Sequence, residues 1–169
     1  MKFILSDIDL KKLLKNCPRC QKSSANGHLI MHHENLIDFD IQNLRRQKLA
    51  IILNSEKNNV GHWVTLLISR SPSNFAIYMD SENKLKHENP IVFLNIKKFC
   101  KKNNLKLIDR SFRNQKIGNY NCGFHVLDTI AKFVHLTNSK FTHYIDALKS
   151  NPIETNENRI FQSVKKHFQ

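Results

Sequence analysis

Apolar residues follow two different spacings along this chain, and each spacing predicts a different kind of element. Four segments repeat them every three or four residues, as the buried face of an amphipathic helix does. These segments are residues 5–16, 90–100, 123–136 and 157–167. Four other segments are short, nearly continuous apolar runs, which is the pattern of buried strands. They are residues 49–54, 60–69, 75–79 and 105–108.

The second and third of these strands are separated by Arg70-Ser71-Pro72-Ser73-Asn74, residue types that favour a tight turn. We therefore expect an antiparallel hairpin. Residues 18–35 are polar, with Gly27 and three histidines, and we expect an irregular loop there. Together the elements predict a single α+β domain over residues 1–169, with a small mixed central sheet flanked by helices.

Composition supports one soluble domain and excludes several other classes. The 169 residues are 40% hydrophobic and 24% charged, values that are ordinary for a globular domain of this length. There is no apolar run long enough for a membrane span and no signal-peptide pattern at the N-terminus. Four cysteines are too few for a secreted disulfide framework in a chain of this size. We expect an intracellular, non-secreted monomer that makes no membrane contact.

The formal net charge is +13, from 27 Lys and Arg against 14 Asp and Glu. Such an excess predicts attraction to polyanions, including non-specific binding of nucleic acid. A solvated basic surface without a specific partner is an equally good interpretation, because the basic segments are spread over the chain.

Cys122 is a candidate nucleophile. It lies where a polar loop gives way to an apolar helical pattern, so it should stand at a helix N-terminus. The unpaired amides at such an end stabilise a thiolate. Gly123 follows directly and should let a substrate backbone approach the sulfur. A buried core cysteine is the alternative for this position taken alone.

His62 and Asp80 are candidates for the base and for the group that orients it. The predicted hairpin should bring His62, at the start of one strand, beside Asp80, at the end of the other. A carboxylate there would fix the imidazole tautomer and stabilise the imidazolium. Gln115 could donate its amide N–H to an oxyanion together with the backbone N–H of Cys122. Trp63 is expected to pack over the site or beneath the hairpin, with substrate contact as the lesser alternative.

These motifs resemble those of one superfamily of cysteine proteases, which contains the adenovirus maturation protease (adenain) and the SUMO-deconjugating proteases. The matching residues are Gly61-His62-Trp63, Asp80-Ser81, Gln115 and Asn119-Tyr120-Asn121-Cys122-Gly123. The resemblance covers most of the chain and implies the papain-like, reversed-order fold of that superfamily. It also implies a catalytic set of His62, Asp80, Gln115 and Cys122, with Trp63 and Gly123 near the substrate.

By this resemblance the function is that of a viral maturation endopeptidase, found in the virion and the infected cell and cleaving structural precursor proteins. The seven-residue spacing from Gln115 to Cys122 favours this branch. The chemistry would need no cofactor, and DNA or a viral peptide would activate the enzyme. Tyr120-Asn121-Cys122-Gly123 is instead similar to the SUMO-deconjugating proteases, so a ubiquitin-like modifier is the alternative substrate. A non-enzymatic nucleic-acid-binding protein is a third hypothesis.

Two further patterns concern metal binding and the helix after Cys122. The Cys17-Pro18-Arg19-Cys20 motif, followed by His28, His32 and His33, contains ligands suited to zinc. The spacing from Cys20 to His28 is short for the common zinc motifs, so a polar loop without metal is the favoured interpretation. His125 and Asp128, in the helix after Cys122, are expected at the surface.

Overall fold

The computed structural model describes residues 5–16, 26–42, 47–56, 61–116, 118 and 121–168. The expected strands are present, and a further one precedes them. The strands are β1 (Asn26–His32), β2 (Lys48–Asn54), β3 (Trp63–Ser69), β4 (Phe75–Met79) and β5 (Lys106–Asp109). The helices are α1 (Asp7–Asn16), α3 (Leu85–Glu88), α4 (Pro90–Lys102), α5 (Cys122–His135), α6 (Asn138–Ser150) and α7 (Ile153–Phe168), with a 3-10 turn η1 (His33–Leu36).

The five strands form one mixed sheet in the order β1-β2-β3-β4-β5, so the spatial order equals the sequence order. β2, β3 and β4 are antiparallel neighbours, whereas β1 and β5 each run parallel to the strand beside them. β3 is buried along its whole length, as its continuous apolar run predicts for a central strand covered on both faces.

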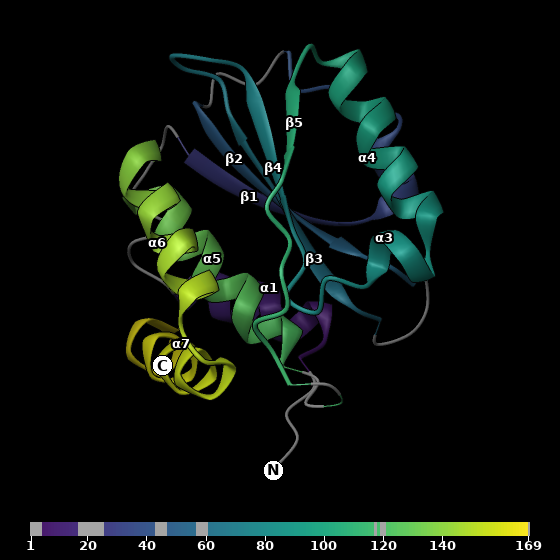
Figure 1. The fold of residues 1–169 in the computed structure, drawn as a ribbon. Helices are drawn as coiled ribbons and strands as arrows, with labels where there is room; N and C mark the ends of the chain where they lie inside the picture. Colours follow the sequence, from purple (N-terminus) through teal and green to yellow (C-terminus); the bar gives the residue numbers. More distant parts are fainter. Residues whose placement is uncertain are drawn as a thin grey trace.

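Helices cover both faces of the sheet (Figure 1). On one face α5 packs across β2 and β3, with α1, α6 and α7 around it. On the other face α4 packs through Val92, Ile96 and Phe99 into a separate apolar cluster with Tyr78 of β4. The described residues therefore form three layers with two apolar clusters, and the mixed α+β architecture predicted from the sequence is confirmed.

The structure differs from the sequence expectation at β1, α6 and α7. β1 lies within the segment expected to be an irregular loop, so that prediction was wrong. Its short alternating core, with Ile30 packed against one face and Leu29 and Met31 against the other, is bordered by polar residues. α7 begins at Ile153, four residues earlier than expected, and α6 was not anticipated. No helix among the described residues has the length and hydropathy of a membrane span.

Candidate active site

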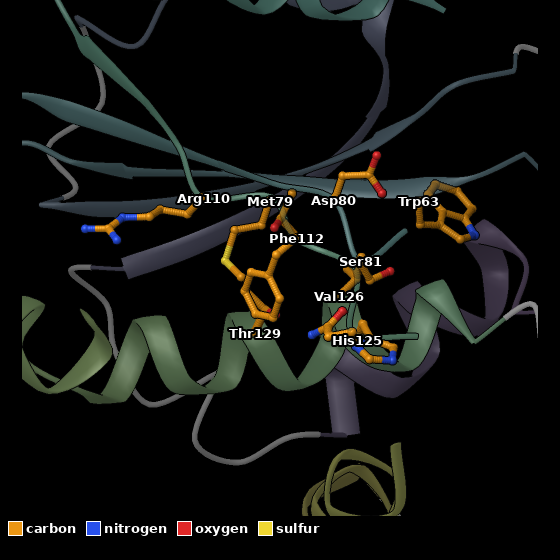
Figure 2. Close-up of a pocket in the computed structure, with 11 residues that line it drawn as sticks. Trp63, Met79, Asp80, Ser81, Arg110, Phe112, His125, Val126 and Thr129 are labelled. Atoms are coloured by element: carbon orange, nitrogen blue, oxygen red, sulfur yellow. The ribbon is translucent and has the colours of Figure 1, made fainter. Parts of the chain in front are cut away.

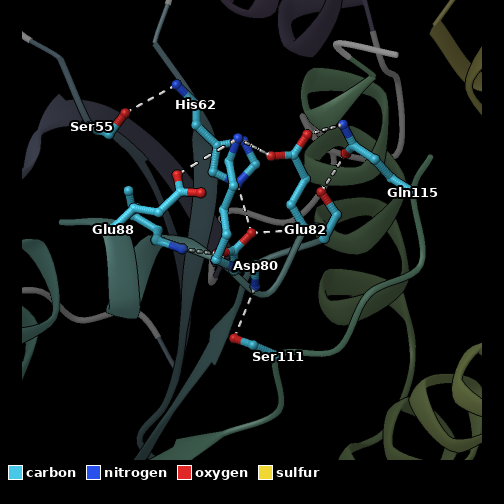
Figure 3. A network of polar contacts seen from close by, with 10 residues as sticks. Ser55, His62, Asp80, Glu82, Glu88, Ser111 and Gln115 are labelled. Carbon is cyan, nitrogen blue, oxygen red and sulfur yellow. Dashed lines mark hydrogen bonds and ion pairs between the residues drawn. The ribbon is translucent and has the colours of Figure 1, made fainter. Parts of the chain in front are cut away.

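The β3–β4 hairpin brings His62 and Asp80 together. His62 directly precedes β3 and Asp80 directly follows β4, so both stand at the same end of the hairpin. His62 Nε2 lies 2.6 Å from Asp80 Oδ1 (Figure 3). The backbone N–H of His62 donates to Ser55 Oγ at 3.0 Å, which holds the histidine against the end of β2. This juxtaposition is the one that the hairpin pattern predicted.

The Asp80 carboxylate is buried and surrounded by donors. Oδ1 accepts the backbone N–H of Glu82 at 2.9 Å, and Oδ2 accepts those of Lys84 at 2.9 Å and Leu85 at 2.8 Å. Burial alone raises the pKa of Asp80, but its hydrogen bond and charge interaction with His62 and the backbone donors outweigh burial and lower the pKa. Asp80 is therefore charged at neutral pH and can stabilise an imidazolium.

Cys122 begins α5 and interacts with the same imidazole. The side chain of the preceding Asn121 makes no capping hydrogen bond, so it does not occupy the amides of the first turn. Burial lowers the pKa of His62, whereas side-chain hydrogen bonds to Asp80 and Cys122 and the charges of both raise it to about 10. Since Nε2 is engaged by Asp80, Nδ1 is the nitrogen left for the thiol. The arrangement suits proton exchange between the imidazole and the thiol.

Gln115 is fully buried, with 0% of its surface exposed. Its Oε1 accepts the Ser81 hydroxyl at 2.7 Å, and its Nε2 donates to Glu82 Oε1 at 3.0 Å (Figure 3). Ser81 and Glu82 directly follow Asp80, so the loop after β4 positions the carboxylate and the amide together. Donation by Gln115 to an oxyanion stays a prediction.

A groove of about 580 Å³ opens beside the thiol. Both Cys122 and His62 line it, so the sulfur and the imidazole face a space large enough for a substrate segment. Within the described part of the chain, the Asp, Glu, Lys and Arg residues that line it are Glu56, Glu82, Glu88 and Lys84. The groove is thus richer in carboxylates than the strongly basic composition of the chain would suggest.

Trp63 and Gly123 both lie against Leu5. Trp63 is buried, and its indole N–H donates to the Leu5 carbonyl at 2.9 Å. A Cβ placed on Gly123 would stand 3.0 Å from Leu5 Cβ and Cδ1. Close packing with the segment before α1 therefore accounts for both residue types. Neither is among the residues that line the groove, and substrate contact by either stays a prediction.

His125 and Asp128 are buried, so their expected surface positions were wrong. His125 is only 4% exposed and lines a small cavity behind Asp80 (Figure 2). Burial and the charge of His62 lower its pKa to about 3. Asp128 accepts hydrogen bonds from the Tyr144 hydroxyl and from Ser163 Oγ. The reason is that the sheet covers one side of α5 while α6 and α7 cover another, leaving little of the helix for solvent.

The metal hypothesis gains no support from the described residues. Cys17 and Cys20 lie outside them. His33 is buried and its Nδ1 lies 3.0 Å from Asn95 Nδ2, a contact that holds η1 against α4. Within the ranges that the structure describes, no group of three or more His, Cys, Asp or Glu side chains is arranged to hold a metal ion.

Glu82 is a residue of this site that the sequence did not single out. It contacts Gln115, and its Oε2 lies 3.9 Å from His62 Nδ1. Its place two residues after Asp80 was the available signal, but a carboxylate in a polar loop usually indicates only solvent exposure.

Comparisons with known proteins yield similarity in structure only. No protein-family model matches the chain, and no curated protein matches it. The central domain of an uncharacterised protein of Legionella pneumophila has a TM-score of 0.58 at 12% identity, covering 96% of this chain and 97% of that one. A de-sumoylating protease has a TM-score of 0.44 at 15% identity, covering 92% of this chain and 74% of that one. The first of these likenesses shows that the fold is shared.

Proposed function

We propose that this protein is a cysteine protease whose nucleophile is Cys122. The observation that carries the proposal is the His62–Asp80 pair, 2.6 Å apart, with His62 and Cys122 lining the same groove. A nucleophile, a base and a carboxylate that orients the base are what thiol-based acyl transfer requires.

In the proposed reaction the thiol proton passes to His62, and the sulfur anion attacks a peptide carbonyl carbon. Asp80 stabilises the imidazolium, and the negative charge that develops on the carbonyl oxygen is held by the Cys122 backbone N–H and by Gln115. His62 returns the proton to the leaving amine as the C–N bond breaks, leaving a thioester on Cys122. A water molecule deprotonated by His62 then hydrolyses the thioester and frees the thiol.

Two substrate classes accompany this proposal. The resemblance to adenain supports cleavage of viral structural precursors, with the virion and infected cell as its location and DNA or a viral peptide as activator. The resemblance of the Tyr120-Asn121-Cys122-Gly123 motif to the SUMO-deconjugating proteases supports a ubiquitin-like modifier instead.

The test of the chemistry is cleavage of an unfolded protein substrate and of a peptide library by the wild type and by Cys122→Ala. We expect turnover by the wild type and none by Cys122→Ala. The control variant Cys100→Ser should retain turnover. Turnover that survives Cys122→Ala would refute the proposal.

The substrate class is tested with ubiquitin-like modifiers carrying a C-terminal vinyl sulfone. Rapid labelling of Cys122 selects the modifier class, and cleavage of precursor sequences without labelling selects the other.

A further inference from the structure

Glu82 links two groups of the proposed active site that have different tasks. Its Oε1 accepts the Gln115 amide N–H at 3.0 Å, and its Oε2 lies 3.9 Å from His62 Nδ1. It also forms an ion pair with Lys84 and lines the groove beside Cys122. Figure 3 shows the carboxylate between the imidazole and the Gln115 side chain.

The side-chain amide of Gln115 has a defined orientation only while both of its hydrogen-bond partners are present. A primary amide can rotate by 180° and exchange its carbonyl and amino ends, so only its partners decide which end faces where. Ser81 donates to the oxygen, and Glu82 accepts from the nitrogen. Because Gln115 is fully buried, bulk water cannot replace either partner, and an unpaired amide N–H there is costly.

A carboxylate beside an oxyanion would ordinarily oppose catalysis, because like charges repel. The pairing with Lys84 offsets this effect. A hydrogen bond to Glu82 raises the pKa of Lys84, so the ammonium remains charged beside the carboxylate. The pair is close to neutral as a unit, while Glu82 Oε1 still accepts the amide N–H.

We propose that Glu82 is a positioning residue that holds the Gln115 amide with its nitrogen toward the reacting carbonyl oxygen. This inference rests on the proposed function. Glu82 touches neither the scissile bond nor the sulfur, and acts through Gln115. The amide has a second N–H, so donation to Glu82 and donation to the oxyanion are compatible.

The test compares Glu82→Ala and Glu82→Gln, each made in the wild type and in Gln115→Ala. Glu82→Ala should lower kcat on a peptide amide by about tenfold with little change in KM, somewhat less than the loss of an oxyanion donor itself. Glu82→Gln should recover kcat to within about threefold, because its carbonyl oxygen can still accept the amide N–H. When Gln115→Ala is already present, adding Glu82→Ala should lower kcat by less than about twofold further, since the amide that Glu82 positions is gone.

Two readouts separate positioning from damage to the fold or to the thiol. Alkylation of Cys122 by iodoacetamide displaces iodide and forms no oxyanion, so its rate should stay within about threefold in Glu82→Ala. In nuclear magnetic resonance spectra, the Gln115 side-chain NH₂ should exchange slowly with water in the wild type and Glu82→Gln, and fast in Glu82→Ala. Glu154→Ala is the matched control, because it removes an exposed carboxylate paired with Lys116, the neighbour of Gln115.

A rise in kcat for Glu82→Ala would overturn the inference and mean that Glu82 covers the amide instead of positioning it. Equal losses in the presence and absence of Gln115 would overturn it as well. Failure of the proposed function gives a different result, namely no cleavage of any amide by the wild type. In that case the exchange rate of the Gln115 amide still decides whether Glu82 orients it.

Discussion

The surroundings of a cysteine decide whether its sulfur can react. Cys100 is buried in α4, and burial raises the pKa of its thiol to about 12. Cys122 is also largely buried, at 7% exposed, but it lines the groove and interacts with His62. Ordinary thiols are mostly protonated at a pH of about 7.5. At that pH, iodoacetamide should modify Cys122 and leave Cys100 intact. Peptide mass spectrometry of the digested protein measures both sites, and modification of Cys100 first would contradict this assignment.

The protonation of His62 gives a prediction for stability against pH. Folding raises its pKa from 6.5 to about 10, so the folded protein binds the imidazolium proton more tightly than the unfolded chain does. This contribution is fully present below the unfolded pKa and is lost as the pH rises through the folded pKa. The free energy of unfolding of the wild type relative to His62→Gln should therefore fall between pH 6.5 and pH 10. Urea denaturation across this interval measures it, and a constant or growing difference would be the contrary result.

Among the elements, the predictable ones had a strong local signal. β2, β3, β4 and α5 were evident because their apolar periodicity matches their burial. β1 was missed because its contacts are with β2, far along the chain, and polar residues surround its short core. The sequence of α6 does carry the apolar spacing of an amphipathic helix, because Phe141, Tyr144, Ile145 and Leu148 repeat every three or four residues and are buried.

The start of α5 offers a test of packing between elements. Gly123→Ala gains helix propensity of about 1 kcal/mol, but its methyl group would stand 3.0 Å from Leu5 Cβ and Cδ1. We expect the substitution to lower the thermal midpoint in the wild type and to raise it, or leave it unchanged, in Leu5→Gly, which removes both atoms. Calorimetry of the four proteins measures this coupling, and equal effects in both backgrounds would exclude it.

The other end of α5 depends on Lys48 of β2. Its ammonium donates to the carbonyls of Phe133 at 2.8 Å and Leu136 at 2.6 Å, which lie in the last turn and C-cap of the helix. Cations stabilise this end of a helix, and charge-assisted hydrogen bonds contribute about 1.5–3 kcal/mol each. Burial lowers the pKa of Lys48 and so offsets part of this gain. Lys48→Met should therefore lower the free energy of unfolding by about 2 kcal/mol, less than the sum of the two bonds. Chemical denaturation measures it, with the exposed Lys140→Met as the control that should change little.

At the scale of the whole molecule, the charge is unevenly placed around the site. The chain carries +13, yet among the described residues the acidic and basic side chains that line the groove beside His62 are three glutamates and one lysine. Nucleic acid should therefore bind away from the groove, through non-specific phosphate contacts. We expect duplex DNA to bind with an affinity that falls at least about tenfold between about 50 and 200 mM salt. Fluorescence anisotropy measures it, and absence of binding at low salt would remove DNA from the proposed activators.

The members of the candidate site that the sequence singled out are those whose residue type and order suit the proposed chemistry, namely His62, Asp80, Gln115 and Cys122. Their convergence could be inferred only for His62 and Asp80, since a hairpin is a local structure. Glu82 and the buried His125 escaped prediction because their importance depends on which elements cover them. An acidic loop residue and a histidine on a helix look like surface positions until α5 and the loop after β4 are placed in space.

The strands enter the sheet in the order in which they are synthesised. Each new strand finds its neighbour already made, so the sheet can be extended one edge at a time as the chain leaves the ribosome. His62 and Asp80 meet early in this sequence, while the sulfur of Cys122 arrives only after the fifth strand. On the nascent chain the imidazole and the carboxylate can therefore pair before the sulfur beside which they stand has been synthesised.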